Sequence, residues 1–136
     1  MLALASIALS AVAGAPLVVY RSTPDLDAAA AWLDGHVQPG EVILANWEVS
    51  NYLAPRTHGS VFGGHPVATL HPRDKQLLMA SFFSHWGTHW GDLEFARRIG
   101  ADWVVYGPAP GELNLPAARA AFESGAVRIF DLRENP

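Results

Sequence analysis

The residues best suited to chemistry follow a short apolar run, Val42–Ala45, and combine two amides, a carboxylate and two aromatic rings. They are Asn46, Trp47, Glu48, Asn51 and Tyr52. Amides and carboxylates bind hydroxyl groups and an aromatic face stacks on a sugar ring, so this pattern is typical of a carbohydrate site. The alternative is structural: Asn46 or Ser50 caps a short helix, while Trp47 and Tyr52 pack in the core.

Two further candidates lie at the ends of other predicted strands. Tyr106 closes the apolar run Trp103–Tyr106, and His65 follows the glycine pair 63–64. His65 is suited to donate a hydrogen bond to a phosphate or a sugar; the alternative is a loop histidine bonded to backbone. Because the carboxyl ends of parallel strands meet at one edge of a sheet, we expect these side chains to share a crevice with the first cluster.

Other catalytic chemistry has little support. The chain has no cysteine, which excludes disulfides, thiolate metal sites and cysteine nucleophiles. It has no nucleophile elbow, glycine-rich phosphate loop or H-E-x-x-H zinc motif. Glu48 follows its strand and Asp102 precedes its own, so the two carboxylates are expected at opposite ends of the sheet, which argues against a glycosidase pair. We predict no catalytic residue and no cofactor.

A loop near the middle of the chain carries two histidines and two tryptophans. His85 and His89 are four residues apart, a spacing that places two metal ligands on one face of a helix. Gly87 between them favours an exposed loop, and we predict no metal site. Trp86 and Trp90 are typical of a segment resting at a membrane interface; the alternative is that their rings are buried and anchor the loop.

Length and charge narrow the classes of protein. The chain has 136 residues, enough for one domain with its own core. It carries 9 lysines and arginines against 13 aspartates and glutamates, for a formal net charge of −4. Nucleic-acid binding needs clustered basic residues to neutralise phosphates, so we expect no nucleic-acid partner.

Strands and helices alternate beyond the amino end. Four strands are predicted at Val42–Ala45, Ser60–Gly64, Ala101–Tyr106 and Val127–Leu132. Helices are predicted from a cap at Ser22 or Thr23 to Leu33, and at Glu48–Pro55, Asp74–Ser84, Asp92–Ile99 and Pro116–Glu123. The helix Asp74–Ser84 is expected to bury Leu77, Leu78, Phe82 and Phe83. This order predicts a three-layer Rossmann-like α/β fold, with a small, mostly parallel sheet of about four strands and helices on both faces. The direction of the last strand is left open.

The amino end forms a separate segment. Residues 1–19 contain no charged side chain, and an apolar helix is expected there before a single α/β domain of residues 20–136. This stretch barely reaches the length that spans a bilayer, so it is interpreted as the remnant of a membrane span. A signal peptide cleaved after Ala11-Val12-Ala13 and a buried helix of the core are the alternatives.

The same residues carry a resemblance to a known family. The chain resembles the soluble C-terminal domain of bacterial membrane glycosyltransferases of the GT-C type, relatives of the protein mannosyltransferases and the aminoarabinose transferases. The matching segments, in order, are Ala30–Leu33, Pro39–Ala45, Ser50–Ala54, Val61–Leu70, Phe82–Phe83, Gly100–Pro108 and Val127–Phe130. The resemblance covers nearly everything from Tyr20 to Leu132.

The resemblance implies a function without chemistry in this chain. In that family the catalytic acids lie between early membrane spans, a region with no counterpart here. The implied role is a non-catalytic accessory domain on the extracytoplasmic side of the membrane, contacting the membrane part of a parent enzyme and the bilayer surface. It would help to bind an acceptor or a polyprenyl-phosphate-linked sugar. The alternative is an exported, stand-alone α/β protein that binds a sugar or another small ligand.

Overall fold

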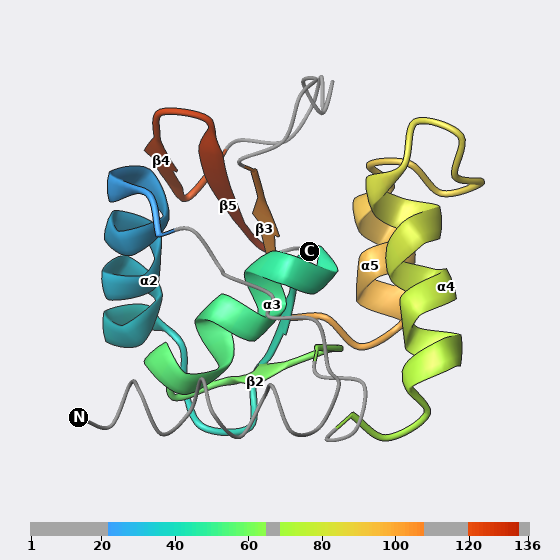
Figure 1. Ribbon diagram of the computed structural model, residues 1–136, viewed down its shortest axis with the longest axis horizontal. Coiled ribbons are helices and arrows are strands. Elements are labelled where there is room, and N and C mark those ends of the chain that lie inside the picture. The colour runs from blue at the N-terminus through green and yellow to red at the C-terminus, as the bar shows by residue number, and fades with distance from the viewer. Residues whose placement is uncertain (1–21, 65–68, 108–119, 134–136) are drawn as a thin grey trace, which may run out of the picture.

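The computed structural model describes residues 22–64, 69–107 and 120–133, which form one mixed sheet with helices on both sides (Figure 1). The five strands lie in the order β2-β1-β3-β5-β4. The strands are β1 (Val42–Leu44), β2 (Ser60–Val61), β3 (Trp103–Tyr106), β4 (Phe122–Ser124) and β5 (Val127–Asp131). The helices are α2 (Pro24–His36), α3 (Trp47–Leu53), the short 3₁₀ turn η1 (Ala54–Arg56), α4 (Pro72–Phe83) and α5 (Leu93–Arg98).

Helix α2 begins where its sequence predicts. The hydroxyl of Thr23 accepts a hydrogen bond from the backbone N–H of Leu26 at 3.2 Å, and Pro24 occupies the first turn. The helix continues past Gly35 and ends at His36. Its apolar side is buried against the sheet, so it positions one wall of the core.

The sheet differs from the mostly parallel, four-stranded sheet predicted. Strand β1 pairs in parallel with β2 and β3, but β5 runs antiparallel to both β3 and β4. The end of the predicted helix Pro116–Glu123 is wrong, because Phe122 and Glu123 belong to β4; residues 116–119 lie outside the described part. Gly125, with φ +54°, opens a two-residue turn that joins β4 to β5 as a tight hairpin.

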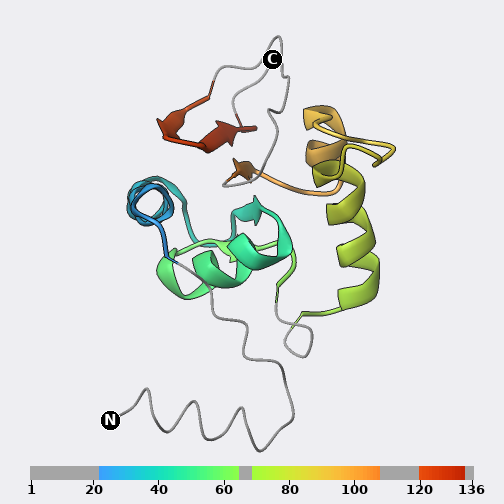
Figure 2. The same ribbon diagram turned by 45° about the horizontal axis from the view of Figure 1, so that its top comes forward.

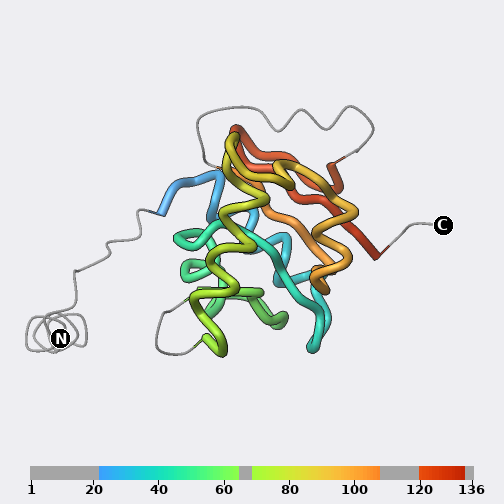
Figure 3. The backbone as a smooth tube through the Cα atoms, turned by 90° about the vertical axis from the view of Figure 1, so that its right-hand side faces the viewer, coloured from blue at the N-terminus to red at the C-terminus, as the bar shows by residue number. Residues whose placement is uncertain are grey.

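Both faces of the sheet are covered, as the sequence predicts for an α/β fold (Figures 1 and 2). Side chains of β3 alternate between the two cores: Trp103 and Val105 face α2 and α3, while Val104 and Tyr106 face α4 and α5. Figure 3 looks onto the second side, with α4 and α5 in front of the sheet. The described residues therefore form three layers.

Helix α4 exposes a leucine that the sequence places in the core. Met79 and Phe82 are buried, and Leu78 and Phe83 pack partly against the same core. Leu77 is 64% exposed, so its predicted burial is wrong. A stripe through residues 78, 79, 82 and 83 already covers the sheet, which turns Leu77 outward.

The predicted membrane segment is not part of the described structure. Residues 1–19 and His65 lie outside it. Within residues 22–64, 69–107 and 120–133, no helix combines the length and the apolar composition needed to cross a bilayer.

Candidate functional site

The carboxyl edge of β1, β2 and β3 is where the sequence predicts a crevice. The structure brings part of the predicted cluster there, since α3 starts directly after β1 and the segment Phe62–Gly64 follows β2. Trp47 is half-buried at this edge and packs against the core on the α4 side, and Asn51 lies one turn further along α3. Glu48 is exposed, and among the described residues no side chain forms a hydrogen bond or ion pair with it.

Asn46 serves as a helix cap. Its Oδ1 accepts a hydrogen bond from the backbone N–H of Val49 at 2.8 Å, which satisfies one of the free donors of the first turn of α3. The buried Ser50 hydroxyl donates to the carbonyl of Ala45 at 3.1 Å. Both side chains therefore fix the junction between β1 and α3, which is the structural alternative for Asn46.

Removing this cap provides a first test. We expect Asn46→Ala to lower the free energy of unfolding by about 1 kcal/mol, measured by urea denaturation followed by circular dichroism. Asn46→Asp keeps an acceptor at the cap and should stay close to the wild type. If Asn46→Ala is as stable as the wild type but binds a sugar ligand more weakly, the Asn46 amide contacts the ligand and does not serve mainly as a cap.

Tyr52 connects α3 to α2. Its ring is buried, its hydroxyl donates to Asp27, and the Arg56 guanidinium lies 3.9 Å from the ring centroid. The hydrogen bonds from the hydroxyls of Tyr52 and Ser22 lower the pKa of Asp27, and burial raises the pKa of Tyr52. The phenol that the sequence offers to a ligand is thus engaged by α2.

Tyr106 lies on the α4 side of the sheet, opposite to Tyr52. It is buried at the end of β3 and stacks on Phe83, with 6.4 Å between the ring centroids. Burial raises the pKa of its hydroxyl, against a smaller opposing effect of the Arg128 charge. Tyr106 therefore contributes to the core beneath α4.

Lys75 joins the carboxyl edge from α4, which the sequence analysis missed. Its Nζ lies 5.2 Å from the ring centroid of Phe62. A Cβ added at Gly63 would lie 3.5 Å from Lys75 Cβ and 3.5 Å from Trp47 Cζ3, and one added at Gly64 would lie 3.2 Å from Asn51 Oδ1. Because residues 63 and 64 are glycines, the backbone of this segment fits closely between the neighbouring side chains. Lys75, Trp47 and Asn51 all lie beside this segment.

The loop after α4 exposes one tryptophan and partly buries the other. Trp86 is 96% exposed. Trp90 packs against the core, and its buried indole N–H has no partner among the described residues. His85 lies against Trp90 and His89 stacks on Phe95, so the two histidines have different neighbours. In the described part of the chain, no three His, Asp or Glu side chains are arranged to hold a metal ion.

A shallow groove of about 260 Å³, with apolar and hydroxyl side chains in its lining, runs beside Trp86. It is lined by residues of α4 and of the following turn: Leu77, Ala80, Ser81, Ser84, Trp86, Gly87 and Thr88. No acidic side chain lines it. We call this area, with the exposed Leu77 and Trp86, the α4 surface.

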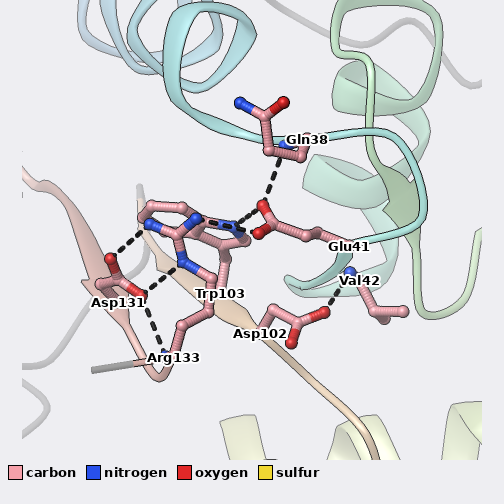
Figure 4. Close-up of polar contacts among 7 residues, drawn as sticks. All are labelled: Gln38, Glu41, Val42, Asp102, Trp103, Asp131 and Arg133. Atoms are coloured by element: carbon pink, nitrogen blue, oxygen red, sulfur yellow. Dashed lines mark hydrogen bonds and ion pairs between the residues drawn. The ribbon is translucent and has the colours of Figure 1, made fainter. Parts of the chain in front are cut away.

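The opposite, amino edge of the sheet holds a dense polar network (Figure 4). Glu41 accepts hydrogen bonds from Trp103 Nε1 at 2.9 Å and from the backbone N–H of Gln38 at 2.9 Å, and forms an ion pair with Arg133 at 2.9 Å. Burial raises the pKa of Glu41, but these hydrogen bonds outweigh it, so the pKa lies below its usual value. The network stabilises the ends of β1, β3 and β5.

Arg133 completes this network, and Asp102 binds the start of β1 beside it. The Arg133 guanidinium binds both oxygens of Asp131, at 2.9 and 2.7 Å, and stacks 4.1 Å from the Trp103 ring centroid (Figure 4). The hydrogen bonds to Asp131, and to a lesser extent the one to Glu41, raise the pKa of Arg133 above its ordinary value. Asp102 Oδ2 accepts from the backbone N–H of Val42 at 2.8 Å. Asp102 therefore lies at the opposite end of the sheet from Glu48, as predicted.

Comparisons with known proteins give only short matches. No family model matches the chain, and no solved structure matches it. Ornithine aminotransferase 1 of Staphylococcus saprophyticus is 44% identical over 48 residues, which cover 35% of this chain and 12% of that protein. Ornithine aminotransferase 1 of Staphylococcus aureus is 44% identical over 45 residues, 33% of this chain and 11% of that protein. The chain thus spans about an eighth or less of the length of these curated relatives.

Proposed function

We propose that this chain is a non-catalytic accessory domain of an extracytoplasmic, membrane-associated glycosyltransferase that uses polyprenyl-phosphate-linked sugars. Its carboxyl edge would help to bind the acceptor or the sugar, and its partners would be the membrane part of the parent enzyme and the bilayer surface. The ordered set of sequence segments between Tyr20 and Leu132 that resembles the GT-C glycosyltransferases supports this proposal. The short matches to ornithine aminotransferases do not enter the proposal, because they span so little of those proteins.

The observation that carries the proposal is the exposed apolar α4 surface. Exposed leucine and tryptophan side chains mark a contact site when they cluster. Tryptophan in particular is enriched where a protein meets the headgroup region of a bilayer. In Figure 1, α4 and α2 lie on opposite sides of the molecule, so α4 would face the membrane while α2 faces away.

A fluorescent probe at Leu77 tests this orientation. Because the chain has no cysteine, Leu77→Cys gives one labelling site for an environment-sensitive dye such as NBD. We expect its emission to rise severalfold on vesicles of phosphatidylethanolamine and phosphatidylglycerol, because a probe in the interface leaves water. The same dye at the exposed Ala31 of α2, as Ala31→Cys, should not respond.

The control also separates other modes of membrane binding. If the protein sediments with the vesicles while the probe at position 77 stays in water, the α4 surface does not contact the bilayer and this part of the proposal fails. Binding through residues 1–19 alone would give that result.

The second candidate function is an exported, stand-alone α/β protein that binds a sugar or another small ligand, favoured by the grouping of Trp47, Asn51 and Lys75. Sequencing the coding region upstream of Met1 distinguishes the two. An open reading frame with many apolar spans, continuous with this chain, would support the glycosyltransferase. Recovery from the soluble periplasm after cleavage near Ala13 would support the stand-alone protein.

A further inference from the structure

The turn after α4 holds Trp86 in a fixed position. The backbone N–H of Gly87 donates to the Ser84 carbonyl at 2.8 Å, and that of His89 donates to the Ser81 carbonyl at 3.2 Å. A Cβ added at position 87 would overlap the Ser81 carbonyl, so glycine is what lets the turn lie this close to α4. Trp86 therefore projects from a turn that is bonded to the end of the helix, while its own side chain is 96% exposed.

The groove beside Trp86 has a size that suits such a side chain. Its volume is about 260 Å³, comparable with that of one tryptophan residue, and Trp86 lines its edge without filling it. Pockets for small molecules usually occupy about 300–1,000 Å³ and enclose most of the ligand. This groove is smaller and shallow, so a side chain that projects from another protein surface fits it better.

The charges on α4 permit two such surfaces to meet. The groove is lined by uncharged side chains, and the hydroxyls of Ser81 and Thr88 there can accept a hydrogen bond from an indole N–H. The exposed charged residues of α4 are Arg73 and Asp74, which lie in its first turn, at the other end of the helix from Trp86. Two copies can therefore bring their grooves together without placing like charges of α4 in contact.

We propose that the α4 surface binds a second copy of this chain in a two-fold symmetric dimer. Because one surface carries both the projecting Trp86 and a groove of matching size, a two-fold rotation places each indole ring in the groove of the other copy. Each ring then leaves water against Leu77 and Ala80, and tryptophan is enriched among the residues that dominate binding energy. The dimer needs no membrane; a bilayer would occupy the same surface, so the two contacts exclude each other.

Sedimentation equilibrium of the full chain without lipid measures this association. An interface made by one helix and one turn belongs to the small class, below about 1,200 Å² of buried surface, so we expect weak binding. The average mass should rise from the 14.6 kDa of one chain towards twice that value between about 5 and 500 μM. Trp86→Ala should weaken the association about thirtyfold or more, because each dimer loses both indole contacts.

Two variants separate the ring from the groove. Trp86→Ala lacks the projecting ring, and Ala80→Trp fills the groove from an exposed position of α4. Each alone should sediment as a monomer, with the far-ultraviolet circular dichroism of the wild type. A mixture of the two should associate more than either one, because the ring of the second variant enters the open groove of the first and restores one of the two contacts.

Leu70→Ala is the matched control for exposed apolar area. Leu70 is 74% exposed but does not line the groove. If the association is specific to the ring and the groove, this variant should dimerise as the wild type does.

Three results would overturn the dimer. The first is a mass that stays at that of one chain over the whole concentration range. The second is association of Trp86→Ala equal to that of the wild type, which would place the contact elsewhere, for example in residues 1–19. The third is a mixture that associates no more than its components. The vesicle experiment at position 77 measures bilayer contact separately, so either result can fail while the other stands.

Discussion

Trp103→Ala is expected to lower the free energy of unfolding by about 3–5 kcal/mol, the usual cost of truncating a large aromatic residue in a core. Trp103 is 1% exposed and lies at the start of β3, where it meets Trp32 edge to face with 5.7 Å between centroids. Its indole N–H also donates to Glu41. The substitution therefore has two effects: it opens a cavity in the core and removes the indole donor from the amino-edge network.

Trp86→Ala is the matched control, since the same side chain is 96% exposed there. A substitution at such a site normally changes stability by no more than about 0.5 kcal/mol. Both variants are measured by urea denaturation followed by far-ultraviolet circular dichroism, because each removes a fluorophore. A change below about 1 kcal/mol for Trp103→Ala would mean that α2 does not close this side of the sheet.

The local elements were largely predictable from sequence because their signals are local. Thr23-Pro24 with two following acids starts α2. The predicted third strand ends at Tyr106, as β3 does, and β1 ends at Leu44, one residue before the predicted end. The hairpin of β4 and β5 was missed. Residues 120–124 have ordinary helix-forming composition, and pairing with β5 overrides it.

The site was only partly predictable, because its members come from distant segments. Asn46 and Trp47 follow a strand end and could be located, although Asn46 is a cap. Lys75 reaches the carboxyl edge only through the packing of α4 against the sheet. The periodicity of the sequence assigned the buried side of that helix incorrectly, because it included the exposed Leu77. The amino-edge network was beyond reach, because Arg133 arrives there only if β5 runs antiparallel, and that direction could not be read from sequence.

Glu41→Ala is expected to lower the free energy of unfolding by about 2–3 kcal/mol at neutral pH. It leaves the Trp103 indole N–H buried without its acceptor, and each such orphaned donor costs about 1–3 kcal/mol. The backbone N–H of Gln38 also loses its partner. The ion pair with Arg133 adds little, since that side chain is partly solvated. Chemical denaturation measures the loss. Glu94→Ala, at an exposed position of α5, should change stability far less.

The pH dependence of stability distinguishes the charge of Glu41 from its packing. The pKa of Glu41 in the folded protein lies below its ordinary value of 4.5, so the unfolded chain binds the proton more readily. Its stabilisation is complete above that value and is lost as the pH falls through the folded pKa. Glu41→Gln keeps an acceptor for the Trp103 indole but does not titrate, so its stability should fall less steeply below pH 4.5. Asp27, whose pKa the Tyr52 hydroxyl lowers, titrates in both proteins and accounts for acid sensitivity that remains. Identical acid profiles for Glu41→Gln and the wild type would show that the network is held by its neutral hydrogen bonds alone.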